Sequence, residues 1–239
     1  MIKTVLITGA SRGIGAAAAK LFAANGYTVI INYLNSAEKA LELAEETGGY
    51  AIKADVSDIV QTENMINEII EKFGKIDVLV NNAGISVTGV FDMVPPGDVK
   101  KLFDINVFGT LNCTRSVLPH MIRRKYGKII NVASMWGETG ASCEVHYSAS
   151  KAAVIGFTKA LAKETGPSGI NVNCVSPGLI MTDMNSCYSA DELDGIIEEI
   201  PLGRSGSPFD VAETILFLAS EKSSFITGQT IGVNGGMIV

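Results

Sequence analysis

Residues 4–15 read TVLITGASRGIG, in which a short β-branched, apolar run leads directly into a glycine-rich loop. Gly9, Gly13 and Gly15 permit a tight turn and let a phosphate group approach the backbone closely. An alanine-rich helical pattern follows at once, so free N–H groups and the positive end of a helix dipole face the loop. This order favours a dinucleotide-binding unit, and a plain strand-to-helix turn is the alternative. The Gly-x3-Gly-x-Gly spacing differs from the Gly-x-Gly-x-x-Gly fingerprint, and no Gly-Lys-Ser/Thr follows, which excludes a P-loop.

The rest of the chain repeats this alternation of strand and helix patterns. Strands are expected at 3–8, 28–33, 50–54, 77–81, 128–133, 170–175 and 229–233. Helical patterns occupy 13–25, 37–47, 65–73, 96–125, 147–165 and 208–220. Such alternation predicts βαβ crossovers, and therefore an α/β fold with one doubly wound, Rossmann-like parallel sheet that has helices on both faces.

The chain contains no linker, repeat or low-complexity tract, so residues 1–239 are expected to form a single catalytic domain of the NAD(P)-binding type. Its long stretch without a predicted strand includes residues 179–207, which polar residues and glycines interrupt. An insertion near the carboxyl edge of a doubly wound sheet is a natural substrate lid. A plain surface excursion is the alternative for the same residues.

Composition and charge exclude several classes of protein. The chain is 47% hydrophobic and 18% charged, which is enough apolar material for a sizeable core. Its net charge of −6 leaves no basic stripe for a nucleic acid, and no apolar run reaches the ~20 residues of a membrane span. The cysteines and the two histidines form no metal-binding pattern. We therefore expect a cytoplasmic protein without a metal ion, in which Cys113, Cys143, Cys174 and Cys187 are free thiols in a reducing compartment.

The end of the second predicted strand bears on which dinucleotide binds. A site for NAD usually places Asp or Glu there to bind the ribose 2′-hydroxyl, whereas this chain has Asn32, and its first acid comes only at Glu38. A carboxylate at this place would repel a 2′-phosphate, so its absence permits NADP. Arg12 adds a guanidinium within the glycine loop that can pair with that phosphate, and a solvated loop charge is its alternative interpretation. The pattern favours NADP(H).

Tyr147 and Lys151 lie four residues apart, hence on one face of a helix, and Ser134 follows the fifth predicted strand at the carboxyl edge of the sheet. Reduction of a carbonyl needs a hydride from a nicotinamide and a proton for the oxygen. The lysine ammonium, together with the charge of an oxidised nicotinamide, is expected to lower the tyrosine pKa by about three units. The Ser134 hydroxyl can hydrogen-bond a developing alkoxide. A surface Tyr–Lys pair and a strand-capping serine are the structural alternatives.

Taken together, these motifs resemble the short-chain dehydrogenase/reductase family. The matching segments are TG-x3-GIG at 8–15, NNAG at 81–84, Asn106, Ser134, Tyr147-x3-Lys151 and SPG at 176–178, in the family's order. Within the family the chain is most similar to the 3-oxoacyl-(acyl-carrier-protein) reductases, including its ending, ITGQ at 226–229 and NGGM at 234–237. The resemblance implies NADPH-dependent ketone reduction, an acyl substrate on acyl carrier protein in fatty acid synthesis, and a homotetramer.

The resemblance also implies roles for particular residues. Tyr147 would be the acid/base, Ser134 the partner of the substrate oxygen, and Lys151 a ribose ligand that modulates the tyrosine. Asn106 would hold a water that links Lys151 to proton exchange with solvent. Together with the loop and strand-end residues above, the residues expected to bind the cofactor are Gly9, Ser11, Arg12, Gly13, Ile14, Gly15, Asn32, Asp55, Val56, Asn82, Ala83, Gly84, Tyr147, Lys151, Pro177, Gly178 and Thr182.

Residues 140–146, GASCEVH, depart from the Gln-Ala-Asn-like run that precedes the tyrosine in fatty-acid reductases. With Met135, Trp136 and Gly137, this segment resembles a Firmicute branch of the group, whose members include reductases of a ketone-bearing modified lysine of elongation factor P. The departure lies in the expected substrate wall, so it concerns the substrate and not the reaction. The alternatives are a reductase of another ketone (the modified elongation factor, a steroid or a small metabolite) and a non-catalytic NADP-binding sensor.

Overall fold

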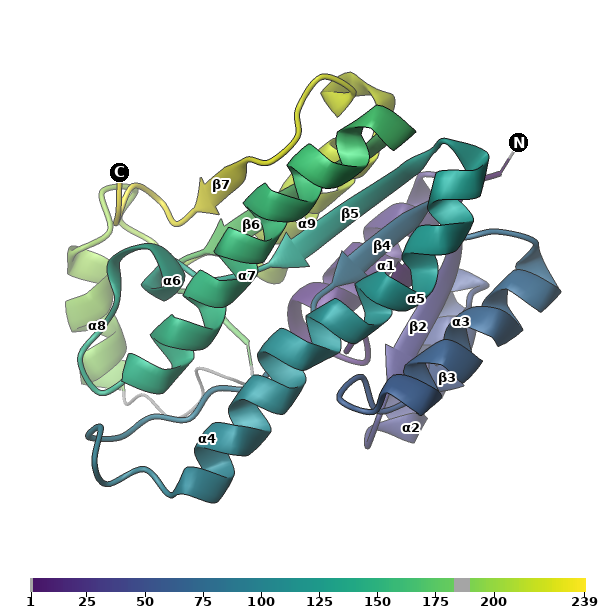
Figure 1. Ribbon diagram of the computed structural model, residues 1–239. Coiled ribbons are helices and arrows are strands. Elements are labelled where there is room, and N and C mark those ends of the chain that lie inside the picture. Colours follow the sequence, from purple (N-terminus) through teal and green to yellow (C-terminus); the bar gives the residue numbers. More distant parts are fainter. Residues whose placement is uncertain (1, 183–189) are drawn as a thin grey trace.

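The order of the strands confirms the doubly wound α/β fold. The computed structural model describes residues 2–182 and 190–239, and within them seven parallel strands form one sheet in the order β3-β2-β1-β4-β5-β6-β7 (Figure 1). The strands are β1 (Thr4–Ile7), β2 (Thr28–Tyr33), β3 (Tyr50–Lys53), β4 (Val78–Asn81), β5 (Gly127–Val132), β6 (Ile170–Pro177) and β7 (Thr230–Val233). The strand order reverses between β1 and β4. Ligands of open α/β sheets bind outside the carboxyl ends of the strands at such a point.

Helices cover both faces of this single domain (Figure 1). One face packs against α1 (Gly13–Ala24), α2 (Ala37–Thr47) and α9 (Pro208–Ala219). The other packs against α3 (Ile59–Phe73), α5 (Gly109–Arg124) and α7 (Val145–Thr165). The shorter helices are α4 (Pro96–Phe103), η1 (Asp104–Phe108), α6 (Trp136–Thr139), η2 (Gly166–Ser168), α8 (Ala190–Glu198) and η4 (Glu221–Ser223).

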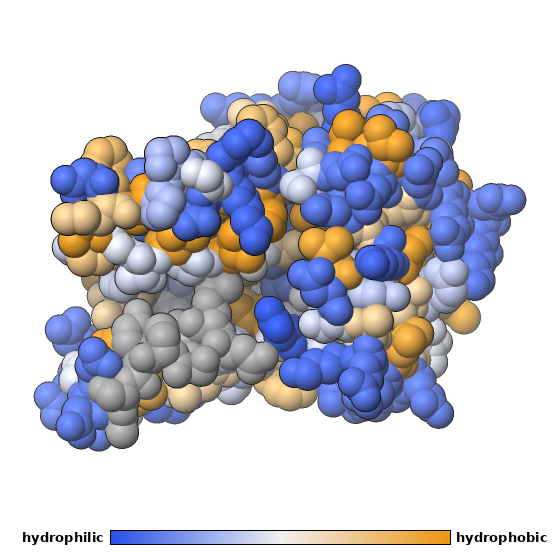
Figure 2. All heavy atoms as spheres, turned by 90° about the horizontal axis from the view of Figure 1, so that it is seen from below, coloured by the Kyte–Doolittle hydropathy of each residue, from blue (hydrophilic) through white to orange (hydrophobic). Residues whose placement is uncertain are grey.

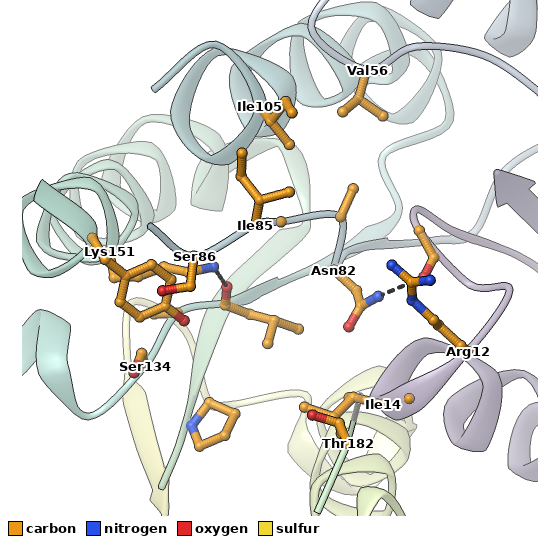
Figure 3. Close-up of a pocket in the computed structure, with 18 of the residues that line it drawn as sticks. Arg12, Ile14, Val56, Asn82, Ile85, Ser86, Ile105, Ser134, Lys151 and Thr182 are labelled. Atoms are coloured by element: carbon orange, nitrogen blue, oxygen red, sulfur yellow. Dashed lines mark hydrogen bonds between the residues drawn. The ribbon is translucent and has the colours of Figure 1, made fainter. Parts of the chain in front are cut away.

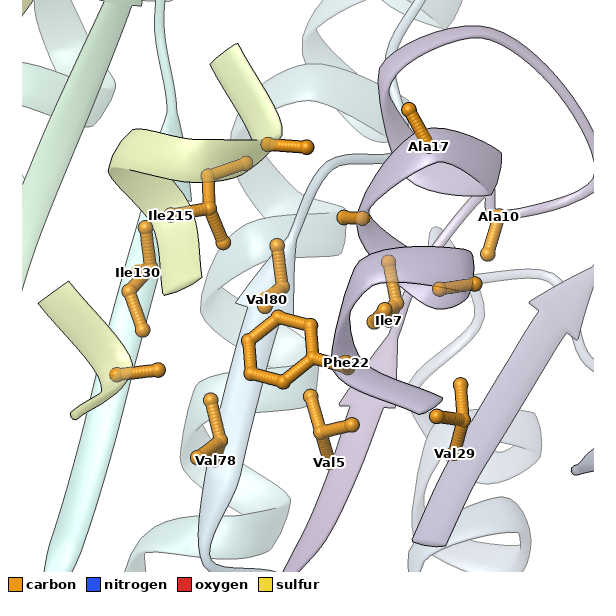
Figure 4. Close-up of a cluster of buried hydrophobic side chains, with 14 of the residues drawn as sticks. Val5, Ile7, Ala10, Ala17, Phe22, Val29, Val78, Val80, Ile130 and Ile215 are labelled. Carbon is orange, nitrogen blue, oxygen red and sulfur yellow. The ribbon is translucent and has the colours of Figure 1, made fainter. Parts of the chain in front are cut away.

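The central strand β1 shows why its sequence is apolar throughout. Val5 and Ile7 pack in the cluster under α1 and α9, whereas Leu6 packs in the opposite cluster, because successive strand side chains point to opposite faces. Figure 4 shows Phe22 of α1 pointing toward the sheet in the first of these clusters. Full burial of one such side chain contributes about 1.5–3 kcal/mol. This rigid centre fixes the loops that leave the carboxyl ends of the strands.

The helical region expected at 96–125 is not one continuous α-helix. It divides into α4, the π-helical segment η1 and α5. Asn106 lies in η1, where it is 1% exposed, and its side-chain amide bonds both backbone polar groups of Ile85. A π-helical turn inserts one residue into a helix without ending it, so the helical pattern continues across it.

The lid predicted at 179–207 is described in part, since residues 183–189 lie outside the described residues. At its two ends, Ile180 pairs with Gly206 in a parallel β-bridge. Ile196 of α8 lines the large cavity described below. The two described ends of this segment are therefore held beside the cavity, and closure over a substrate stays a prediction.

Figure 2 shows the molecule from below the view of Figure 1, with hydrophilic residues dominating and hydrophobic residues in separate small groups.

Candidate active site

A cavity of about 1020 Å³ runs along the carboxyl ends of the strands. Figure 3 places Arg12 at one end of it and Ser134 and Lys151 at the other. Two of the predicted site residues do not line it: Gly15 is buried under Asn82, and Asn106 is buried beside Ile85. The predicted residues that line it are Gly9, Ser11, Arg12, Gly13, Ile14, Asn32, Asp55, Val56, Asn82, Ala83, Gly84, Ser134, Tyr147, Lys151, Pro177, Gly178 and Thr182.

The glycine loop is held against the loop that follows β4. Gly9 has φ +61°, and a Cβ there would lie 2.8 Å from the Cα of Ala83. The side-chain amide of Asn82 donates to the carbonyl oxygens of Thr8 (2.9 Å) and Gly9 (3.1 Å), and the Thr8 hydroxyl accepts from the backbone N–H groups of Asn82 and Ala83. No side chain caps the first turn of α1. The glycine loop, with Gly9 and Gly13, thus forms a cradle in front of uncapped N–H groups of α1. We call it the glycine cradle, and its shape fits the pyrophosphate of a dinucleotide.

The end of β2 carries no acidic side chain at the cavity. Asn32 is 2% exposed, and its side chain accepts from the Gly9 N–H and donates to the Ala54 carbonyl oxygen. Asn32 therefore braces the glycine loop, and the contact with cofactor expected for it stays a prediction. Tyr33 ends the strand and lines the cavity beside it. After the neighbouring strand β3, the Asp55 carboxylate accepts from the N–H and hydroxyl of Ser57.

Ser134, Tyr147 and Lys151 meet at the other end of the cavity, on the carboxyl end of β5 and the first turns of α7. All three are at most 9% exposed. Ser134 and Tyr147 both line this end of the cavity, and the Lys151 ammonium lies 5.7 Å from the centre of the tyrosine ring. Lys151 Nζ also donates to the Val132 carbonyl oxygen over 2.9 Å, which fixes the side chain along the cavity floor.

Burial dominates the electrostatics of this group. It raises the pKa of Tyr147 to about 12, although the hydrogen bond from Ser134 opposes the rise, and a negative charge at Glu144 adds to it. Burial also lowers the pKa of Lys151 to about 8. The lowering of the tyrosine pKa that is expected beside an oxidised nicotinamide stays a prediction, because in the protein alone the pKa of Tyr147 is raised. The reason is that losing water destabilises the phenolate more than its protein neighbours stabilise it.

Asn106 lies close to Lys151 across Gly84. A Cβ on Gly84 would lie 3.2 Å from Asn106 Oδ1 and 3.4 Å from Lys151 Nζ. The Asn106 amide accepts from the Ile85 N–H and donates to the Ile85 carbonyl and the Ser150 hydroxyl. The structure thus brings Asn106 to the tyrosine–lysine group, and the water expected between them stays a prediction.

The sequence motifs assigned no individual role to two residues of this site. Thr8, at the end of β1, holds the loop after β4, as described above, and Glu144 lines the cavity at the start of α7. The available signals were a polar residue directly after a buried strand and an acid within the unusual segment 140–146. Neither signal identifies the residues to which Thr8 and Glu144 are hydrogen-bonded, because those residues lie more than 50 positions away in the chain.

The described part of the chain offers few other candidate sites. It contains no group of three His, Cys, Asp or Glu residues that could hold a metal ion. None of its helices combines the length and the apolar character needed to cross a membrane. Cys113, Cys143 and Cys174 are free, and Cys187 lies outside the described residues.

Comparisons with known proteins agree with this geometry. Residues 9–238 match the family described as "Enoyl-(Acyl carrier protein) reductase". The 3-oxoacyl-(acyl-carrier-protein) reductase FabG of Staphylococcus epidermidis is 44% identical over 99% of both chains, and that of Thermotoga maritima is 42% identical over 99% of this chain and 98% of its own. The uncharacterized oxidoreductase YmfI of Bacillus subtilis is 42% identical over 99% of both chains. This chain therefore belongs to the short-chain dehydrogenase/reductase family of nicotinamide-dependent oxidoreductases.

Proposed function

We propose that this enzyme uses NADPH to reduce 3-oxoacyl groups carried on acyl carrier protein to 3-hydroxyacyl groups. The observation that carries the proposal is the convergence of Ser134, Tyr147 and Lys151 at one end of a cavity whose other end is a glycine cradle. Relatives with this activity in their names match the chain from end to end. A reduced nicotinamide supplies a hydride to the ketone carbon. The residues of the chain then have to hold the oxygen and provide its proton.

The proposed roles follow from where the polar atoms lie. The Ser134 hydroxyl hydrogen-bonds the substrate oxygen and holds it near the Tyr147 hydroxyl, which gives its proton to that oxygen as negative charge develops. A tyrosine with a raised pKa holds its proton at neutral pH, so it is ready to act as an acid. Lys151, with a pKa lowered to about 8, can release and regain a proton near neutral pH, and we assign it the restoring of the tyrosine proton.

The cofactor would lie between the two ends of the cavity. Backbone groups of Gly9, Gly13 and Ile14 would hold the pyrophosphate, and Arg12 the 2′-phosphate. We place the adenine beside Asp55 and Val56, and Asn82, Ala83 and Gly84 along the cofactor. The nicotinamide end would lie beside Pro177, Gly178 and Thr182.

The end of β2 provides a test of the NADP preference. Asn32 is unsuitable, because an aspartate there would face the buried carbonyl oxygens of Ile52 and Ala54. We expect Tyr33→Asp to shift the ratio of kcat/KM for NADPH to that for NADH at least about tenfold toward NADH, since its carboxylate repels the 2′-phosphate. Tyr33→Asn is the matched control, because it removes the same ring without adding charge. Equal ratios in the two variants would show that the 2′-phosphate lies elsewhere.

The substrate assignment is tested by NADPH oxidation with a 3-oxoacyl thioester, presented on acyl carrier protein and on coenzyme A, with NADH in parallel. Faster turnover of the carrier-bound form is expected. NADPH binding with negligible turnover of both thioesters would direct the search to another ketone. The unusual segment 140–146 is the specific reason, because its Glu144 lines the cavity. Binding without turnover on a broad panel of carbonyl compounds would favour a cofactor sensor.

We also propose that the enzyme is a cytoplasmic homotetramer. Large apolar side chains are exposed at the start of α5 and along α9, where Phe108 is 52% and Phe209 is 49% exposed. Association of copies through these helices would remove that surface from water. Light scattering should therefore give four times the mass of the chain, and a single-chain mass at micromolar concentration would contradict the proposal.

A further inference from the structure

A loop on the rim of the cavity is fastened to the segment that leads into α7. We call residues 85–93 the rim loop. Two of its hydroxyl groups donate to one carboxylate: Ser86 Oγ to Glu144 Oε2 over 3.0 Å, and Thr88 Oγ1 to Glu144 Oε1 over 2.7 Å. Figure 3 places Ser86 at the same end of the cavity as Ser134 and Lys151. Glu144 thus joins two segments that are more than 50 residues apart in the chain.

Further contacts follow the same seam. The Gly89 N–H donates to the Cys143 carbonyl oxygen over 2.8 Å. The ring of Phe91 stacks on that of His146 with centroids 4.8 Å apart. Cys143 has φ +61°, a left-handed conformation that side chains other than glycine rarely adopt. The backbone before α7 therefore accepts a strained residue where it meets the rim loop.

Glu144 is also the N-cap residue of α7, yet its side chain makes no capping bond. A capping side chain at this position accepts from the N–H groups of the second or third helical residue, and the third residue here is Tyr147. Both carboxylate oxygens bind the rim loop instead. The carboxylate therefore connects two segments across the rim of the cavity and does not cap the helix.

The carboxylate also brings a negative charge to the cavity wall that contains Tyr147. Like charge disfavours the phenolate, so Glu144 raises the pKa of Tyr147, in addition to the effect of burial. Other charged or titratable groups surround the site on the neighbouring elements: Lys151 and His146 on α7, Glu138 on α6, Lys101 on α4, Asp104 on η1, Asp92 on the rim loop and Cys174 on β6. The pKa of Tyr147 responds to the charge of Glu144 and not to those of Glu138, Asp104 or Asp92.

We propose that Glu144 is a positioning residue, whose carboxylate fastens the rim loop across the substrate end of the cavity and places a fixed negative charge beside Tyr147, so that the tyrosine keeps its proton for ketone reduction. This proposal rests on the proposed function, since it assigns Tyr147 the role of the acid. It separates two effects of one side chain, hydrogen bonding and charge, which different substitutions can remove independently.

Glu144→Gln tests the charge. The glutamine can accept from Thr88 and donate to the Ser86 oxygen, so the rim loop stays attached while the charge is lost. Removal of the negative charge stabilises the phenolate. The alkaline limb of kcat/KM for ketone reduction should therefore move to lower pH by about 0.5–1 unit. Oxidation of the corresponding alcohol requires the phenolate, so its rate at neutral pH should rise. An unchanged alkaline limb would overturn the role that we assign to the negative charge of Glu144.

Two controls distinguish charge from structure. Glu138→Gln removes one nearby negative charge from α6 without touching the rim loop, and should leave the pH profile in place. The double variant Ser86→Ala/Thr88→Ala removes both hydrogen bonds and keeps the charge, so KM should rise while the alkaline limb does not fall. A fall in the alkaline limb for this double variant would assign the effect to loop position and overturn the electrostatic part.

Hydrogen exchange tests the fastening without any turnover. The Gly89 N–H, bonded to the Cys143 carbonyl, should exchange at least about tenfold faster in Glu144→Ala than in the unmodified protein, and at a nearly unchanged rate in Glu144→Gln. Equal protection in all three proteins would overturn the positioning role. Failure of thioester turnover with this exchange pattern intact would instead count against the proposed substrate, and the pH profiles would then be measured with a ketone that the enzyme does reduce.

Discussion

Tyr147→Phe should lower kcat for ketone reduction by ~10²–10⁴-fold, the usual contribution of a positioned general acid. This range corresponds to about 3–5 kcal/mol in the activation free energy. The side chain is 9% exposed, and phenylalanine keeps the ring in its packed position while it removes the hydroxyl that bonds Ser134. The Kd for NADPH, measured by fluorescence titration, should change little, because the glycine cradle is untouched.

Tyr126→Phe is the matched control. The Tyr126 hydroxyl bonds Lys3 and Glu221, and Tyr126 does not line the large cavity. This variant should therefore lose some stability, by about 1 kcal/mol for the lost bonds, and keep its turnover. Near-normal turnover of Tyr147→Phe, with Tyr126→Phe behaving as expected, would remove Tyr147 from the role of acid.

Gly15→Ala should weaken NADPH binding by at least about tenfold and lower the free energy of unfolding by about 1–3 kcal/mol, the usual cost of overpacking. A Cβ at this position would lie 2.6 Å from Asn82 Nδ2, 2.8 Å from the Ala10 Cα and 2.9 Å from the Gly9 carbonyl oxygen. Two of these atoms belong to the backbone of the glycine loop, so the loop itself has to move. Isothermal titration with NADPH and denaturant unfolding measure the two effects.

Gly156→Ala provides the comparison for that substitution. Gly156 lies in α7, and a Cβ there would meet no atom within 4 Å. Alanine is favoured over glycine in a helix by about 1 kcal/mol, so this variant should gain stability and bind NADPH normally. Equal NADPH affinity in Gly15→Ala and Gly156→Ala would show that the glycine loop does not hold the cofactor.

The fold could be predicted because its signals are local. The buried run at 4–7 followed by glycines, and the alternation of strand and helix patterns after it, specify βαβ units, and right-handed crossovers leave few ways to arrange them. The same logic brings Ser134 and the Tyr147–Lys151 pair together. The serine ends β5, the pair shares one face of α7, and the carboxyl ends of parallel strands meet at one edge.

Other features depend on contacts that no local pattern encodes. Asn32 occupies the strand end expected to contact the cofactor, yet its amide turns inward to Gly9 and Ala54. Asn106 lies in a π-helical turn, and its amide binds Ile85, which is 21 residues away. The direction of each amide is set by which backbone groups the packed chain leaves unpaired, because a buried unpaired group costs about 1–3 kcal/mol.

The sequence by itself thus determined the sheet and the glycine loop, since propensity, period and spacing act over a few residues, and the resemblance to a family supplied the residues proposed to carry the chemistry. The tertiary structure alone decided their electrostatics. Burial raises the pKa of Tyr147 in the protein without cofactor, and Glu144 reaches the site because the rim loop folds back onto the start of α7. Solvent exposure and distant charges are properties of the packed chain, and they are fixed only when segments far apart in sequence meet.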